Sequence, residues 1–589
     1  MRSSKILAAF LILAPLTALD ATAGQTQSQL TYRGSTNLSA SAAATDTGGL
    51  GPETHIGIEF DASFERIAKG TISPSRVPAA HVPTPTDSAI AGVVANAGFN
   101  GLTHRDQRLA SGGNQFSSEP PDQALAVGNG FIVEAVNTAL RVRKTDGTIV
   151  VAAVGLNQFF GLAPAINRTT GAFGPFTSDP KAYFDADTQR WFVTMLEIDQ
   201  DPVSGDFLPH SAVLIAVSQT SNPAGAWYQY SIDTTNATGA PEHAGCPCLG
   251  DQPLIGADAN GFYVTTNEFP LFQSGFNGAQ VYAMSKAMMV AGTPPKVIAF
   301  DGLPLAEGPA YTLQPAITAQ GGSHASINQG TEYFLSALDF NGTLDNRIAV
   351  WALTNTQSLN TATPSLTLKS AVIDSQVYGQ PPDARQKPGP TPLGDAIQAG
   401  AFGKAGAQPL PLIAANDDRM QQVTWADGKL WSSLNTVVKP HNGTVQSGAG
   451  YFIVAPAWNG TALGGSVVKQ GYVSASGLSL LFPSVGVNKS GKGVISFSIV
   501  GTALFPSVGY ADIDAVNGAG AIKLVALGTE PDDGFTGYAF FADRAGRWGD
   551  YSAAVADADG VIWFANEYIP GGPRTLLANW GTFIGRVPR

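Results

Sequence analysis

Gly549–Tyr568 reads "GDYSAAVADADGVIWFANEY", and much earlier in the chain Gly250–Phe269 reads "GDQPLIGADANGFYVTTNEF". Both stretches begin with Gly-Asp and end with Asn-Glu and an aromatic residue. Each contains an apolar strand, a turn in which Asp or Asn precedes Gly, and a second strand rich in aromatic and β-branched residues. A sequence motif that occurs twice in one chain, as this one does, indicates a repeat architecture.

Further copies of the phrase occur along the chain, and third and fourth strands follow in most of them. The copies start at Pro121, Ser178, Gly250, Leu313, Arg419, Leu481 and Gly549. Repeats of about 50 to 60 residues, each with four antiparallel strands, predict an all-β fold: a seven-bladed β-propeller. A parallel β-helix would have shorter repeats, and separate sandwiches would not repeat the phrase. Trp191, Trp431 and Trp563 fall inside second strands and are expected in the core between blades.

The last unit stops at about its third strand, in "ANWGTFIGRVPR". A fourth strand must come from elsewhere if the ring is to close without an exposed edge. The N-terminal region offers two candidates, "SAIAGVVANAGF" (Ser88–Phe99) and "HIGIEF" (His55–Phe60). We therefore expect an N-terminal extension that closes the last blade.

The first residues have the pattern of a secretory signal. Arg2 and Lys5 precede an apolar run from Ile6 to Leu19, and Ala21-Thr22-Ala23 supplies the small residues that signal peptidase accepts. We expect a signal peptide at residues 1–23, an Ala/Ser/Pro-rich extension with the closing strand at 24–115, and the propeller at 116–589. The mature protein is expected to be secreted, either extracellular or periplasmic, as a monomer without a membrane span.

Charge and cysteine content exclude several classes of partner. The net charge of −12 argues against nucleic acid and anionic membranes, which need basic patches. The two cysteines, Cys246 and Cys248, lie in "HAGCPCLGD". A disulfide across Cys-Pro-Cys would be strained, although an oxidising compartment permits it. His243 adds a third ligand type, but no second Cys/His cluster completes a zinc site, so no metal is predicted there and structural or free thiols are preferred.

Four phrases carry a resemblance to a known family. "PPDQALAVG", "SDPKAYFDADTQRWFV", "GDQPLIGADANGFYVTTNE" and "WGDYSAAVADADGVIWFANEY" resemble phrases of secreted bacterial β-propellers of the sialidase/BNR-like kind, many of which have no assigned activity. The resemblance covers roughly Phe116–Arg589 and implies a propeller fold. The full Ser-x-Asp-x-Gly-x-Thr-Trp box of that family is absent; the nearest match, "SNPAGAW" at Ser221–Trp227, lacks the Asp.

Polar residues recur at two positions of the repeat. In a propeller blade, the start of the first strand and the end of the second open on the same face, beside the axial funnel. The first position holds Asp122, Asp179, Asp251 and Asp550, and the second holds Asn137, Glu197, Glu268, Asp339, Thr436 (with Asn435 beside it) and Glu567. Blades five and six depart from the pattern at the first position, where Met420 and Phe482 stand. The sequence therefore predicts an arc of carboxylates on one face.

Two interpretations of this arc remain open. The carboxylates can be structural ties that accept backbone N–H groups between blades, repeated because every blade needs the same tie. Alternatively, Asp251, Glu268, Asp550 and Glu567 are catalytic and divide acid and nucleophile or base roles, as in glycosidases. The ligand-binding candidates are then Asp122, Asn137, Asp179, Glu197, Asp339 and Asn435. Ca²⁺, which prefers oxygen ligands, is the one cofactor that the carboxylates leave open.

Other catalytic patterns are missing from the sequence. It contains no His-Glu-x-x-His, no Gly-x-Ser-x-Gly elbow in a strand-turn-helix context and no phosphate loop. We therefore expect a binding or scaffold propeller that recognises an extracellular glycan or protein through its funnel face. A glycoside hydrolase, or another carbohydrate-active enzyme that uses paired funnel carboxylates, is the alternative.

The signal-peptide prediction can be checked on the exported protein. Mass spectrometry of protein recovered outside the cytoplasm should find Gly24 at the N-terminus, because cleavage follows Ala23. An intact Met1 on the exported protein would show that residues 1–23 are not removed.

Overall fold

The computed structural model describes residues 24–40, 56–58, 81–236, 243–306, 308–338, 344–403, 406–441, 443–541 and 545–589. Strands dominate, which confirms the predicted all-β class. The α-helices are short: α2 (His104–Leu109), α3 (Leu156–Phe159), α4 (Lys286–Val290) and α5 (Pro392–Gln398). Within these described ranges, none of the helices has the length and apolar character needed to span a membrane.

The strands of each repeat unit pair antiparallel in sequence order, and we number the resulting sheets 1 to 7. Sheet 1 contains β7 (Ala124–Gly128), β8 (Phe131–Val136), β9 (Ala139–Lys144) and β10 (Ile149–Gly155). Sheet 2 contains β11 (Phe176–Asp185), β12 (Arg190–Gln200), β13 (Phe207–Ser218) and β14 (Ala226–Asp233). Sheet 3 contains β15 (Cys248–Ala257), β16 (Gly261–Pro270), β17 (Gly278–Ser285) and β18 (Lys296–Asp301).

The remaining sheets follow the same plan. Sheet 4 contains β21 (Gln314–Thr318), β22 (Thr331–Ala337), β23 (Asp345–Thr354) and β24 (Thr367–Tyr378). Sheet 5 contains β26 (Val423–Ala426), β27 (Lys429–Val438), β28 (Gln446–Asn459) and β29 (Ala462–Val473). Sheet 6 contains β30 (Leu478–Val487), β31 (Lys492–Gly501), β32 (Leu504–Asp514) and β33 (Gly518–Ala526). Sheet 7 contains β35 (Ala553–Ala556), β36 (Ile562–Tyr568) and β37 (Gly581–Val587).

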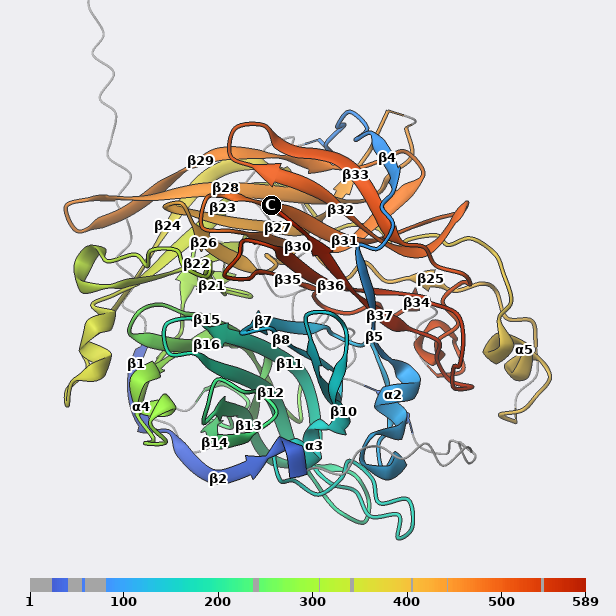
Figure 1. Cartoon of the computed structure of the whole chain (residues 1–589), viewed down its shortest axis with the longest axis horizontal. Coiled ribbons are helices and arrows are strands. Elements are labelled where there is room, and N and C mark those ends of the chain that lie inside the picture. The colour runs from blue at the N-terminus through green and yellow to red at the C-terminus, as the bar shows by residue number, and fades with distance from the viewer. Residues whose placement is uncertain are drawn as a thin grey trace, which may run out of the picture.

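The first strands of the sheets lie at the middle of the molecule. Each of them contacts the first strand of the next sheet, and β35 of sheet 7 contacts β7 of sheet 1. Two of these contacts, β15 with β21 and β21 with β26, include parallel pairing that joins sheets 3, 4 and 5. In Figure 1 the labels of β7, β15, β21, β30 and β35 lie centrally, whereas β2, β29 and β33 lie at the periphery.

Turn chemistry and apolar packing explain these units. In the turn between β35 and β36, the Asp557 carboxylate accepts the N–H groups of Asp559 and Val561, each at 3.0 Å, and Gly560 adopts a φ of 82°. The second strands then bury large side chains between adjacent sheets. Trp191, Trp431 and Trp563 are all buried in such inter-sheet clusters, as predicted.

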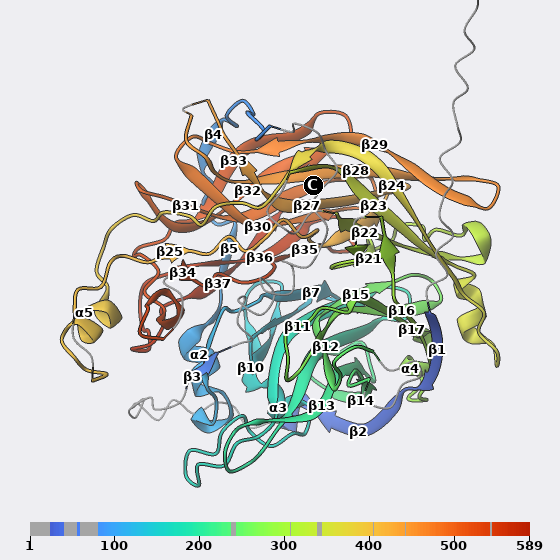
Figure 2. The same cartoon turned by 180° about the vertical axis from the view of Figure 1, so that it is seen from behind.

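Strands from the N-terminal region line the outer edges of several sheets. The structure contains β1 (Gly24–Gln29) beside β18, β2 (Thr31–Asn37) beside β14, β4 (Ile90–Val93) beside β33 and β5 (Gly98–Thr103) beside β37. Figures 1 and 2 show β1 and β2 along the periphery near α4 and β14. These strands cover backbone groups that would otherwise form exposed edges.

The fourth strand of sheet 7 differs from both sequence candidates. It is β5, which shares only Gly98 and Phe99 with the first candidate. The earlier part of that candidate forms β4 and pairs with sheet 6. The second candidate contributes β3 (Ile56–Ile58), which pairs in parallel with β6 (Ser117–Glu119). The remaining pairs are short: β19 (Pro304–Leu305) with β20 (Gly308–Pro309), and β25 (Leu412–Ile413) with β34 (Ala545–Gly546).

The β5–β37 pairing gives a stability prediction. A Cβ added at Gly98 would lie 2.0 Å from the carbonyl oxygen of Ile584 on β37, so Gly98→Ala must push the two strands apart. We expect a loss of about 1 to 3 kcal/mol in the free energy of unfolding, measured by chemical denaturation. The control is Gly464→Ala on β29, where the added Cβ meets its nearest atom at 4.0 Å. Equal losses in both variants would contradict the importance of this pairing.

Candidate functional site

Asp122 and Asp179 lie at junctions between neighbouring sheets. Both are buried, and both have a positive φ, 47° and 56°. One oxygen of Asp122 accepts the N–H of Asp550 from sheet 7 at 2.6 Å. Likewise, Asp179 accepts the N–H of Gln252 from sheet 3 at 3.1 Å. Asp179 therefore ties sheet 2 to the first strand of sheet 3, and Asp122 ties the segment before sheet 1 to the segment before sheet 7.

Asparagines at the ends of second strands make the same kind of tie. Asn137 accepts the N–H of Asp179 at 2.8 Å and also donates to Asp122 at 2.7 Å. Asn435 accepts the N–H of Phe482, again at 2.8 Å. In sheet 3 the equivalent residue is Asn267, which accepts the N–H of Thr312 at 2.8 Å. The acceptor in that sheet is thus the neighbour of the predicted residue Glu268.

The residue that corresponds to Asp122 and Asp179 in sheet 3 is Gln252. Gln252 has a φ of 49° and donates the N–H described above, whereas the predicted Asp251 is half-buried beside it. The side chain of Gln252 accepts a hydrogen bond from Arg419 at 2.7 Å, and Arg419 also forms a two-point ion pair with Asp417. Arg419 is buried, so this cation lies within the molecule near the start of sheet 5.

Asp550 is the predicted catalytic residue that faces Asp122. Its Oδ1 accepts a hydrogen bond from Asn416 at 2.5 Å, and the Arg547 guanidinium lies 3.5 Å away. Burial raises the pKa of Asp122 to about 8, and the nearby Asp550 and Asp179 carboxylates add to that shift. Asp122 is therefore largely protonated at neutral pH.

Glu567 belongs to a buried carboxyl cluster, which we define as Glu119, Asp532 and Glu567. Burial, together with repulsion from Asp532 and Glu119, raises the pKa of Glu567 well above its usual value. Burial also raises the pKa of Asp532 to about 7. Glu119 accepts the N–H and the hydroxyl of Thr536 at 2.9 and 2.7 Å, so it holds the loop before sheet 7 in place.

Glu197 contacts the N-terminal strand β2. Its buried carboxylate lies 2.7 Å from the guanidinium of Arg33. Burial raises the pKa of Glu197, and the charge of Arg33 opposes that shift. This ion pair fastens β2 to the same face that carries the inter-sheet ties.

Glu268 is the centre of a polar network at the edge of sheet 3. His243 Nδ1 lies 2.6 Å from one carboxylate oxygen, and His243 Nε2 lies 3.6 Å from Asp301. Hydrogen bonds to Asp301 and Glu268 raise the pKa of His243 to about 10, so the imidazole is a cation between two carboxylates. The side-chain amides of Asn236, Asn277 and Gln280 also donate to Glu268.

The cysteines near this network are joined. Cys246 and Cys248 form a disulfide, and their sulfurs lie with a Glu268 oxygen within 4.8 Å of one another. A metal ion binds cysteine as a thiolate, and the two sulfurs are not thiolates while the disulfide is formed. The predicted residue Asp339 lies outside the described residues.

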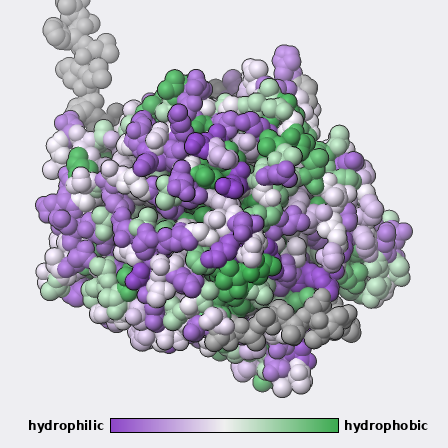
Figure 3. All heavy atoms as spheres, viewed as in Figure 1, coloured by the Kyte–Doolittle hydropathy of each residue, from purple (hydrophilic) through white to green (hydrophobic). Residues whose placement is uncertain are grey.

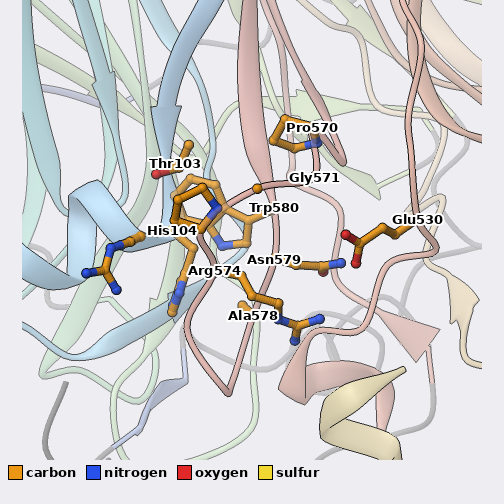
Figure 4. A pocket seen from close by; sticks show the side chains of 12 residues that line it. Thr103, His104, Glu530, Pro570, Gly571, Arg574, Ala578, Asn579 and Trp580 are labelled. Atoms are coloured by element: carbon orange, nitrogen blue, oxygen red, sulfur yellow. The ribbon is translucent and has the colours of Figure 1, made fainter. Parts of the chain in front are cut away.

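Long connections on the face of the ties enclose a hollow of ≈ 280 Å³, counted with its open mouth. The start of α2 contributes His104, whose pKa burial lowers to about 3, so its ring is neutral. The His104 ring meets Trp580 edge-on at 5.5 Å. Figure 4 shows Glu530 across the hollow from Thr103 and Trp580. The loop after β36 supplies much of the wall, including Pro570, Gly571, Arg574, Ala578 and Asn579.

The carboxylates and the hollow together are better suited to binding a ligand than to hydrolysing one. A hydrolase needs two carboxyl groups that reach substrate, one as acid and one as base or nucleophile. Asp122, Asp179 and Glu567 are buried, and the first two accept backbone N–H groups. The hollow, by contrast, presents the Glu530 carboxylate and the backbone around Gly571 to solvent, whereas the Trp580 ring behind them is buried. In the view of Figure 3, the surface of the molecule is mostly hydrophilic, with apolar side chains gathered in small patches.

Comparisons with known proteins find solved structures of low sequence identity and low structural similarity. No protein-family model matches the chain, and no curated protein matches it. Among solved structures, a Dyadobacter fermentans protein of unknown function is 9% identical over 70% of this chain and 95% of its own, with a TM-score of 0.28. The phage phi92 endosialidase is 8% identical over 81% and 69%, with a TM-score of 0.27. An α-L-arabinanase variant from Cellvibrio cellulosa is 12% identical over 59% and 94%, with a TM-score of 0.22. The fold assignment therefore depends on the strand pairing above.

The pKa of Asp122 predicts how stability changes with pH. Between about pH 4 and pH 8 the folded state binds more protons than the unfolded state, so the free energy of unfolding falls as pH rises through that window. Asp122→Asn should reduce this slope by up to about 1.4 kcal/mol per pH unit, measured by denaturant unfolding at several pH values. Asp146→Asn is the control, because Asp146 is exposed and has a lowered pKa. An unchanged slope in Asp122→Asn would contradict the raised pKa.

Proposed function

We propose that this protein is a secreted, seven-bladed β-propeller that binds an extracellular glycan on the face carrying its long loops, without hydrolysing it. The observation that carries the proposal is that Asp122 and Asp179 are engaged in inter-sheet ties, while Glu197, Glu268 and Glu567 are buried. A side chain that accepts backbone N–H groups and is buried cannot also meet a substrate.

The contacts of the first strands support a closed ring. They run from sheet 1 to sheet 7 in order and return from β35 to β7. Within the parts of the chain described, β5 gives sheet 7 four strands, as in the other sheets. Seven blades joined in this way would leave one face for the connections between sheets, and the hollow of Figure 4 lies among those connections.

The hollow carries polar groups that can bind a sugar at its rim. Sugar hydroxyl groups both donate and accept hydrogen bonds, which carboxylates and backbone groups recognise. Glu530 is half-buried at the wall, and the backbone of Gly571 and Gly572 adds further polar groups. The enclosed part of the hollow is only ≈ 10 Å³, so a glycan would lie across its mouth and contact the rim.

A glycoside hydrolase is the second candidate, and one observation favours it. Burial raises the pKa of Asp122, whereas the adjacent Asp550 contacts Arg547 and Asn416, so the two carboxyl groups differ in environment; a hydrolase would need a movement that exposes them. Such a difference is how one site provides both an acid and a base.

Glycan arrays and polysaccharide digests of the mature protein test both candidates together. We expect saturable binding and no release of reducing ends. Glu530→Ala should weaken binding at least tenfold, whereas Asp559→Ala, an exposed change in the turn at the other end of sheet 7, should leave it unchanged.

Two outcomes would overturn the binding proposal. Defined products that disappear in Asp550→Asn would establish the hydrolase instead. Absence of binding to any glycan, with a normal melting curve, would remove glycan recognition altogether.

A further inference from the structure

The two cysteines differ sharply in exposure. Cys246 is partly exposed in the connection before β15, whereas Cys248, at the start of β15, is fully buried. Cys246 is therefore the cysteine that we expect a thiol from solution to attack. This is the arrangement of a disulfide that exchanges through one defined sulfur.

The buried sulfur has a hydrogen-bond donor beside it, which favours its departure as a thiolate. Asn277 donates to Cys248 Sγ at 3.5 Å and to Glu268 at 2.9 Å, so one amide contacts both the sulfur and the carboxylate. A Glu268 oxygen lies within 4.8 Å of both sulfurs. The backbone N–H of Cys246 donates to the carbonyl of His243 at 3.4 Å, and the His243 ring contacts Glu268, whose carboxylate lies near both sulfurs.

A purely structural role explains the pair poorly. The two cysteines are two residues apart, so the disulfide closes a very short loop. In the chain-entropy account, the stabilisation by a disulfide grows with the length of the loop that it closes. The Cys246–Cys248 bond is therefore expected to contribute little to the stability of the fold.

We propose that Cys246–Cys248 is a thiol–disulfide exchange site that oxidises small thiols or exposed dithiols of other exported chains. The substrate thiolate attacks Cys246 Sγ, the S–S bond breaks, and Cys248 leaves as a thiolate that takes up a proton. A second substrate thiolate attacks the substrate sulfur of the mixed disulfide and releases Cys246. Two substrate thiols become one disulfide, and the protein disulfide becomes two thiols, so each chain supplies one two-electron oxidation.

The chain contains no other cysteine, so every thiol signal reports on this pair. We would incubate the folded wild-type protein with reduced glutathione, quench with acid and map the mixed disulfide by peptide mass spectrometry. Glutathione should appear on Cys246 at least tenfold more often than on Cys248. A mixed disulfide mainly on Cys248, or reduction only at the rate of global unfolding, would overturn the proposal and leave a structural bond.

Single-cysteine variants give a second, independent measurement. The Cys246 thiol in Cys248→Ser should react with a chromogenic disulfide at least tenfold faster than the Cys248 thiol in Cys246→Ser. Melting curves establish that both variants are folded. If either is unfolded, the wild-type mapping alone decides.

The role of Asn277 has a matched control. Asn277→Ala should slow the first exchange step about fivefold to tenfold, because the departing sulfur loses its hydrogen-bond donor. Gln273→Ala removes a nearby amide that donates to the Gly245 carbonyl at 3.0 Å and not to sulfur, and should change the rate little. Equal rates in Asn277→Ala and wild type, across pH, would refute a contribution of Asn277 to the exchange.

Discussion

At the inner end of several sheets, a backbone N–H turns away from its own strand ladder and is accepted by a side-chain oxygen of a neighbouring sheet. The donors are residues with positive φ, such as Asp179, Gln252 and Phe482, which follow or interrupt regular pairing. A buried N–H without an acceptor would cost about 1 to 3 kcal/mol. The acceptor side chain thus fixes where one sheet meets the next, and the packing of large side chains such as Trp563 follows from that placement.

This constraint explains why polar residues repeat with the period of the fold. A carboxylate or an amide serves equally as an acceptor, so Asp179 and Asn435 fill the same role with different chemistry. The repetition by itself therefore reports architecture. Residues that depart from the repeat, such as Glu530 in a connection or His243 beside the disulfide, are better guides to what distinguishes this chain.

Much of the strand order was predictable because local chemistry determines it. The turn at Asp557–Gly560 and the alternating apolar strands around it act within a few residues. The position of Gln252 was missed because the repeats were aligned on the acidic residue. The same irregularity recurs in sheets 2 and 6, where a proline follows the positive-φ residue, and an alignment on that proline would have identified Gln252. Strands β1 and β2 have few apolar residues, and the edges of β18 and β14 make them strands. Partners such as Arg33 and Thr536 lie in segments outside the repeat.

The pairing of β5 with β37 also bears on the order of folding. Tyr568 and Asn100, joined by a hydrogen bond at this seam, are 468 residues apart in the sequence. During synthesis β5 is made early, but its partner is completed only near the end of the chain. Contacts of such separation form slowly, because a long segment must be ordered before they are gained. The β5–β37 pair is thus expected to form late in folding. A chain that stops before β37 leaves β5 unpaired, even when its middle sheets have formed.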